Sequence, residues 1–128
     1  MSLIELLDRL SKLRPALCKH RPDYHIEFYE LHDGEDWIPC IPSKVGKRHL
    51  SQIKGAIERA IEAEIDKPGN LWTGYVAGQS LADGKFARIY SPEFPYNPDA
   101  DRWAIERRMQ ENQAIALLGC LIACLELE

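Results

Sequence analysis

Four basic side chains gather in a short segment that leads into a predicted helix. They are Lys44, Lys47, Arg48 and His49. Backbone N–H groups at a helix N-terminus, the helix dipole and nearby cations together bind phosphate and other anions. The segment lacks the glycine spacing of a phosphate-binding fingerprint, so a solvated basic loop is the alternative. Further cations available to this anion site lie later in the chain: Arg88, Arg102, Arg107 and Arg108.

A second candidate is the loop 92–99, which combines three prolines with Phe94 and Tyr96 and is followed by Trp103. Aromatic side chains on a stiff loop lose little entropy on binding, and Tyr and Trp are frequent binding hot spots. The alternative is a loop packed over the domain's own core or across a subunit interface. The predicted ligand-binding residues are therefore Lys44, Lys47, Arg48, His49, Arg88, Phe94, Tyr96 and Trp103.

The other residues with chemical potential favour structural roles. His25 and His32 have acidic neighbours and suit general acid–base chemistry, but no nucleophile elbow, dinucleotide fingerprint or P-loop accompanies them. Cys120 and Cys124 share one helix face, yet no further ligand motif completes a zinc set. Two small core residues are the favoured interpretation, because free cysteine is commonly buried. We expect no catalytic residue, no metal and no cofactor, and an enzyme of unrecognised type remains an alternative.

Composition narrows the class of protein. The chain has 128 residues, 45% of them hydrophobic and 28% charged, which is typical of one globular domain. Its net charge of −4 disfavours nucleic acid as a partner, since such binding needs a basic footprint. The longest apolar run, 114–125, is too short to cross a bilayer. The acidic N-terminal residues do not resemble a signal peptide, so we expect a cytoplasmic protein with reduced thiols.

Three helical regions are predicted from periodicity and capping. Ser2 and Glu5 form a capping box for a first helix that continues to Leu13. Arg48–Lys67 carries an apolar stripe and ends at Pro68-Gly69. The last helical region is expected to begin after Asp99 or Asp101 and to reach Leu127, with a break near Asn112.

Four strands are predicted between these helices: 24–32, 37–41, 71–77 and 86–91. Turns at Asp33-Gly34 and 82–85 join them into two hairpins, and Pro39 places the second strand at a sheet edge. His20–Asp23 is expected to be a break. The order α-ββ-α-ββ-α predicts a single α+β domain over residues 1–128, with a four-stranded, mostly antiparallel sheet packed with helices.

The segment 114–125 has no polar face, and a helix that is apolar all round must be buried all round. A single chain achieves this only if the helix is covered on two sides. The alternative, which we favour from the sequence, is that one side meets the sheet and the other meets a second subunit. The sequence therefore predicts a homodimer or larger homo-oligomer through the 114–125 helix.

The second half of the chain resembles the phage ABA (α/β/α) sandwich domain, a family of unknown function. The resemblance rests on the tryptophan-bearing hairpin, from 71–75 to 87–90, and on the closing helix rich in Ala, Leu and Cys, 112–126. The 92–101 loop departs from the family pattern. The resemblance implies a layered α/β/α fold and a phage or mobile-element origin, and it implies no catalytic residue.

These features favour a non-catalytic binding protein. It would bind a small anionic, nucleotide-like ligand or a host protein, for example in counter-defence, because aromatic stacking and cations together hold bases and phosphates. A structural or assembly homo-oligomer is the first alternative, and a small enzyme using His25, His32 and acidic neighbours is the second.

Overall fold

The helices form where the sequence supplies both an apolar stripe and a cap. The computed structural model describes residues 2–22, 27–41, 46–82 and 84–127. It places α1 at Leu3–Leu13, α2 at Lys47–Asp66 and α3 at Gln113–Glu126. Ser2 accepts a hydrogen bond from the Glu5 amide at 3.4 Å and its hydroxyl donates to the Glu5 carboxylate at 3.0 Å, which confirms Ser2 as the predicted N-cap. The side chain of Asn112 caps α3 in the same way, accepting from the Ile115 amide at 2.8 Å.

The described strands form two antiparallel sheets. The first has the order β1-β2-β3 and the second the order β4-β5-β7-β6. Their bounds are β1 Cys18–Pro22, β2 Glu27–His32, β3 Trp37–Cys40, β4 Gly74–Ser80, β5 Gly84–Tyr90, β6 Tyr96–Asn97 and β7 Arg102–Gln110. The α+β class and the four-stranded antiparallel sheet predicted from the sequence are confirmed.

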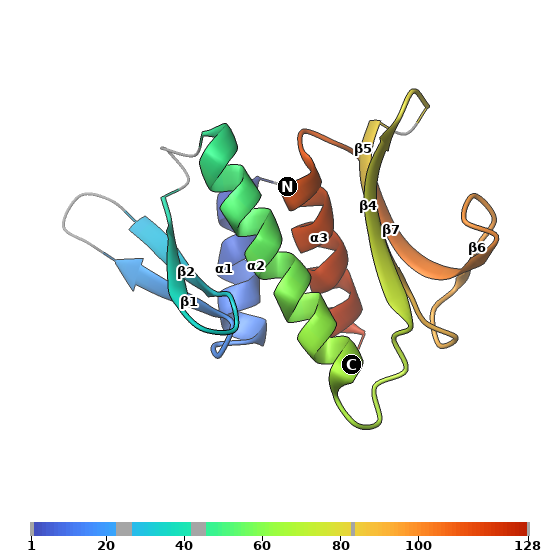
Figure 1. Ribbon diagram of the computed structural model, residues 1–128, viewed down its shortest axis with the longest axis horizontal. Coiled ribbons are helices and arrows are strands. Elements are labelled where there is room, and N and C mark those ends of the chain that lie inside the picture. Colours follow the sequence, from blue (N-terminus) through green and yellow to red (C-terminus); the bar gives the residue numbers. More distant parts are fainter. Residues whose placement is uncertain (1, 23–26, 42–45, 83, 128) are drawn as a thin grey trace.

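The helices lie between the two sheets (Figure 1). The three-stranded sheet packs on α1 and α2, and these two helices pack on α3. On its other side, α3 packs against β5 and β7 of the four-stranded sheet. The layers therefore run from sheet to helix pair to central helix to sheet, and the opposite face of the four-stranded sheet is not covered by a described helix.

This layering explains the apolar composition of α3. The helix is enclosed within one chain, and its fully buried side chains include Leu117, Leu118 and Leu121. Its composition therefore does not require a second subunit, although a homo-oligomer remains a prediction. No helix in the described part of the chain combines the length and apolarity needed to cross a membrane.

The segment after residue 101 is where the prediction of a helix was wrong. Residues 102–110 form β7, and α3 begins only at Gln113. Asp101 does not cap a helix: it lies in the β6–β7 turn with a φ of 50°. The local composition of β7, rich in Glu, Arg, Met and Gln, favours a helix. Pairing with β5 along its length outweighs that weak local preference, because strand stability comes mainly from cross-strand and face packing.

The prediction of a break at His20–Asp23 was also wrong for residues 20–22, and Asp23 lies outside the described residues. Residues 18–22 form β1, paired antiparallel with β2. Arg21 forms an ion pair with Glu30 on β2 at 2.6 Å, a cross-strand contact that the turn-like sequence does not reveal. The β2–β3 hairpin therefore belongs to its own sheet, and the β4–β5 hairpin is joined by β7 and β6 instead.

The enclosure of α3 predicts a large cost for truncating its central side chains. Leu121→Ala should lower the free energy of unfolding by about 2–5 kcal/mol, since it leaves a cavity in a fully buried position. Leu127→Ala is the matched control on an exposed side chain and should change it by less than about 0.5 kcal/mol. Guanidinium denaturation measures both values. A similar small effect for the two variants would contradict the central placement of α3.

Candidate functional site

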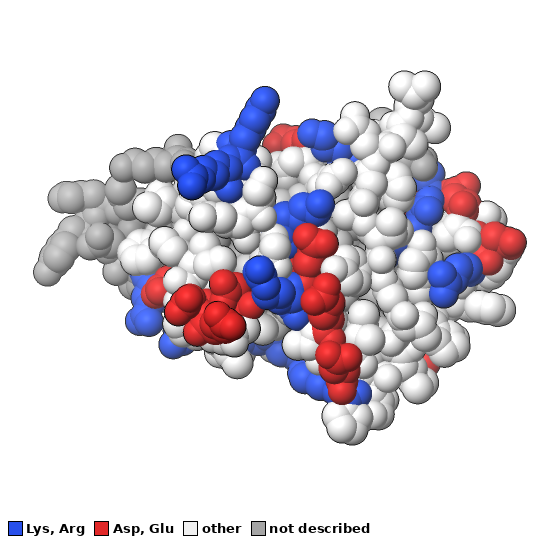
Figure 2. Space-filling view, viewed as in Figure 1, with Lys and Arg blue, Asp and Glu red and all other residues white. Residues whose placement is uncertain are grey.

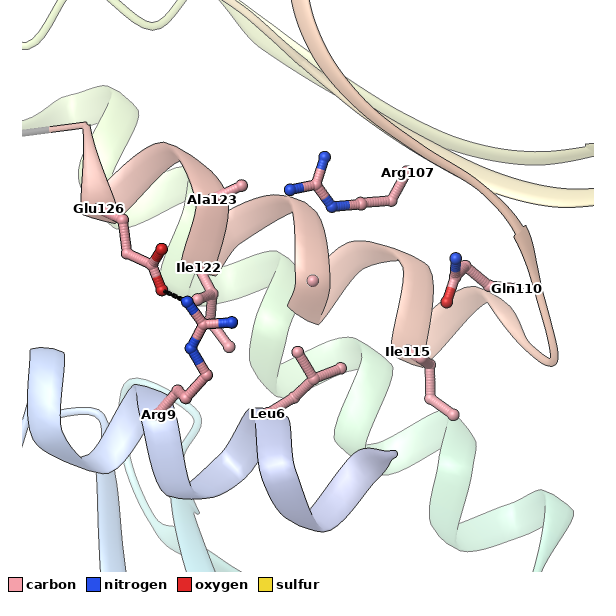
Figure 3. A pocket seen from close by; sticks show the side chains of 9 residues that line it. Leu6, Arg9, Arg107, Gln110, Ile115, Ile122, Ala123 and Glu126 are labelled. Carbon is pink, nitrogen blue, oxygen red and sulfur yellow. Dashed lines mark hydrogen bonds and ion pairs between the residues drawn. The ribbon is translucent and has the colours of Figure 1, made fainter. Parts of the chain in front are cut away.

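A groove runs along the one part of α3 that is not fully buried (Figure 3). Its volume is about 200 Å³. The floor comes from α3, one wall from α1 and the other from β7. The lining residues are Ile115, Gly119, Ile122, Ala123 and Glu126 of the floor, with Leu6, Arg9, Arg107 and Gln110 of the walls.

Two small residues create the depth of this groove. Gly119 and Ala123 are four residues apart, so they lie on the same face of α3. A Cβ atom at Gly119 would have the Cγ of Arg107 as its nearest neighbour at 3.6 Å, an ordinary contact. Packing would therefore accept alanine here, and glycine inside a helix costs about 0.5–1 kcal/mol relative to alanine. The glycine keeps space open that the fold itself does not need.

The charged groups of the groove differ in how they are paired. Arg9 of α1 forms an ion pair with Glu126 near the end of α3 (Figure 3). Arg107 uses one guanidinium nitrogen to donate to the Glu106 carbonyl at 2.9 Å, and it forms no ion pair with a described carboxylate. The exposed guanidinium of Arg107 therefore brings a positive charge to the groove that no carboxylate of the described residues neutralises.

The outer face of the four-stranded sheet carries a network centred on Glu106. This carboxylate accepts hydrogen bonds from Arg88 at 2.8 Å, from Arg108 at 2.6 Å and from Asn97 at 3.0 Å. Burial alone would raise the pKa of Glu106, but the hydrogen bonds from its three partners outweigh it and hold the pKa at about 2. Arg88, predicted to bind an anion, is thus already neutralised by an internal carboxylate.

The aromatic residues predicted to bind a ligand divide into two groups. Phe94 is buried and packs near Trp72, with ring centroids 6.3 Å apart, so it belongs to the core. Tyr96 and Trp103 are 51% and 54% exposed and meet edge to face at 5.7 Å. The Tyr96 hydroxyl donates a hydrogen bond to Asp101, and this bond raises the pKa of Tyr96. These two rings form an exposed pair on the β6–β7 hairpin.

The predicted basic segment lies elsewhere. Lys44 falls outside the described residues, and Lys47 and Arg48 are exposed in the first turn of α2. The Nε2 atom of His49 lies 2.6 Å from the Pro39 carbonyl oxygen and ties this turn to β3. Arg88 lies on β5 of the other sheet, where its neighbours Ala87 and Ile89 are in the core and Arg88 itself bonds to Glu106 on the outer face. The structure therefore does not bring the basic segment and the aromatic pair into one site.

The remaining candidates for chemistry have structural roles. The four cysteines are free and buried, and burial raises the pKa of Cys18 and of Cys40 to about 12. His32 accepts a hydrogen bond from the Gly34 amide in the β2–β3 turn, and His25 falls outside the described residues. Within the described ranges no three His, Cys, Asp or Glu side chains gather as a metal-binding group.

The acidic β2–β3 turn is held by its own backbone. Asp33 accepts hydrogen bonds from the amides of Asp36 at 2.7 Å and Glu35 at 2.9 Å, and these bonds lower its pKa. Wider hollows of about 410 and 360 Å³ flank this turn and are lined by Asp33 and Arg59 among others. Both are more open to solvent than the groove, although the larger one is lined in part by Trp37, Ile38 and Pro39.

Sequence reasoning missed the groove as a site. Arg107 was noted only as an added cation, and Arg9, Gln110 and Glu126 were not considered. The signal that the sequence does hold is the pair Gly119 and Ala123 inside a run of large apolar residues. Small residues four apart on one helix face leave a hollow wherever no neighbouring element fills it.

Glu106→Gln tests the charge network of the outer face. A carboxylate whose pKa is lowered by folding stabilises the fold above its unfolded pKa of about 4.3, and this stabilisation is lost as the pH falls toward 2. The variant should lower the free energy of unfolding at pH 7 by roughly 1–3 kcal/mol. Denaturation curves between pH 7 and pH 2 measure the difference in free energy of unfolding between the variant and the unmodified protein. This gap should close below about pH 5. Glu93→Gln, at an exposed position, is the control, and a gap independent of pH would contradict the network.

Comparisons with known proteins complete the description of these sites. The chain matches no protein-family model, no curated protein and no solved structure. The groove and the exposed aromatic pair are therefore interpreted from their own geometry and chemistry.

Proposed function

We propose that this protein is a non-catalytic binding protein whose groove between α1, α3 and β7 takes a small organic anion. One observation carries the proposal: the guanidinium of Arg107 lies over an apolar floor without a carboxylate partner among the described residues. An apolar cleft with a few convergent polar groups is the usual form of a small-molecule site. The ligand would be a carboxylate with a short apolar body.

The size and charge of the groove narrow the ligand class. Its volume of about 200 Å³ is below the range of roughly 300–1,000 Å³ common for drug-sized ligands. Arg107 offers a planar fork that matches one carboxylate, and the other arginine of the groove, Arg9, is already in an ion pair with Glu126. These features favour a monoanion over the polyphosphate of a nucleotide.

The groove supports binding more than catalysis. Among its described lining residues there is no histidine, and the one carboxylate, Glu126, is held in an ion pair by Arg9. A general acid or base needs a titratable group free to exchange a proton with the substrate. A phage or mobile-element role rests on the family resemblance of the second half, and the groove does not depend on it.

A second candidate function is binding of a host protein through the β6–β7 hairpin. Its basis is the exposed pair Tyr96 and Trp103, next to Arg102, whose guanidinium lies 4.1 Å from the centre of the Tyr90 ring. Tyr, Trp and Arg are the residue types enriched in protein interfaces and their hot spots. This surface and the groove share no residue, so the two functions can be tested separately.

Arg107→Met tests the charge that the proposal requires. The variant keeps an apolar stem over Gly119 but loses the cation, so it should weaken binding of benzoate or hexanoate at least tenfold. Nuclear magnetic resonance titration of the labelled protein measures the affinity, with shifts expected for residues 107–110 and 119–126. The neutral probes benzamide and hexan-1-ol are matched controls, and Arg102→Ala is the control variant on the opposite sheet face. Equal shifts with charged and neutral probes would contradict the proposal.

Substitutions at Gly119 test the space that the groove requires. Gly119→Ala should raise the free energy of unfolding by about 0.5–1 kcal/mol, since it removes a helical glycine where the new Cβ meets only an ordinary contact. Gly119→Leu should fill the groove and abolish benzoate binding while the fold is retained. Thermal unfolding and the same titration measure the two effects. Full benzoate affinity in the leucine variant would place the ligand elsewhere.

A further inference from the structure

β4 is a free edge of the four-stranded sheet. It lies at one end of the order β4-β5-β7-β6 and pairs with β5 along Gly74–Ser80. On its other side no described strand pairs with it. Every second residue of an edge strand directs its N–H and C=O groups away from the sheet, and these groups are a template for another strand.

The other sheet edges carry features that block such pairing, and β4 carries none. β3 contains Pro39, which has no N–H to donate, and β1 contains Lys19 and Arg21. β6 is only two residues long. By contrast, the run 70–82 around β4 has neither a charged residue nor a proline, in a chain that is 28% charged. Figure 2 shows this as an uncharged band beside the charged side chains of α2.

We propose that β4 pairs antiparallel with β4 of a second copy of this chain, so that the two four-stranded sheets become continuous. In an antiparallel pair, two directly opposed residues either both direct their N–H and C=O groups toward the partner strand or both direct them away from it. Neighbouring residues on one strand alternate between these two orientations. The two-fold axis must therefore pass beside a residue and not between two residues. Opposed charges would repel across such an axis, and β4 has none to oppose.

The two exposed leucines that flank β4 select the register. Leu71 is 47% exposed and Leu81 is fully exposed, and Val76 lies midway between them in the sequence. An axis beside Val76 brings the end of β4 that Leu71 precedes next to the end of the other copy's β4 that Leu81 follows. Both apolar side chains then leave water together at each end of the paired strands. An unrelated extended peptide would satisfy the backbone of β4 but would not explain this symmetric placement.

Side-chain size agrees with the same register. Tyr75 faces α2, where its hydroxyl donates to Glu62 at 2.8 Å, so Val76 faces the outer side of the sheet. The axis places Val76 against Val76 of the second copy, and Gly74 against its Gly78. The ring of Phe86 already covers Gly78, lying 3.0 Å from where a Cβ would stand. No bulky side chain opposes another at the centre of the pair.

Molar mass in solution tests the proposal. Light scattering coupled to size-exclusion chromatography should give twice the chain mass of 14.6 kDa for the unmodified protein. Val76→Lys opposes two cations at the axis and should give a folded monomer, whereas the control Val76→Thr should stay dimeric. A monomeric unmodified protein at tens of micromolar would overturn the proposal, as would a dimeric lysine variant. This interface lies away from the groove, so benzoate binding should be unchanged in the monomer.

Cross-linking tests the register and does not depend on the lysine variant folding. Antiparallel neighbours have Cα atoms about 4.5–5.5 Å apart, within disulfide range. Val76→Cys should therefore form an intermolecular disulfide on mild oxidation, and the four buried native cysteines should not. Ala77→Cys, which this register opposes to Tyr75, is the control and should cross-link poorly. Preferential cross-linking at position 77 would overturn the Val76 axis.

Discussion

The structure depends on the burial of one helix that has no polar face. α3 cannot present any broad side to water, so the chain must cover it from every direction. α1 and α2 cover one side and the four-stranded sheet covers the other. The three-stranded sheet then covers the far side of the helix pair (Figure 1). The order of the layers follows from this single requirement.

The same requirement determines where other surfaces remain available. Because the helices occupy the space between the sheets, the outer face of the four-stranded sheet is left to solvent and carries the Glu106 network. Between its two ends, the described part of the central helix is open where its own residues are too small to meet its neighbours, at Gly119 and Ala123. The groove is thus a local gap in an enclosure that is otherwise complete in the described part of the chain.

Local signals in the sequence predicted the elements that local interactions determine. The N-cap at Ser2, the apolar stripe of α2 and the Asp33 turn all act over a few residues, and the structure has them. β7 was missed because its strand state comes from pairing with β5, many residues away. The groove was missed for a similar reason: it joins α1, β7 and α3, and no sequence pattern records that juxtaposition. The basic segment at α2 was recognised as a cluster, but the fold places it apart from the aromatic pair.

The features that suggest function are those where this chain departs from an otherwise consistent pattern. Several of its charged side chains form ion pairs: Arg88 with Glu106, Arg9 with Glu126 and Lys67 with Glu64. The exposed side chain of Arg107 forms no ion pair with a described carboxylate, and it lies next to Gly119, a helical glycine that packing does not require. Likewise, charge or proline is present on β1 and β3 but missing from β4. Natural sequences often break local rules where a ligand or partner compensates the cost. A small anion at the groove and a second copy at β4 would supply that compensation.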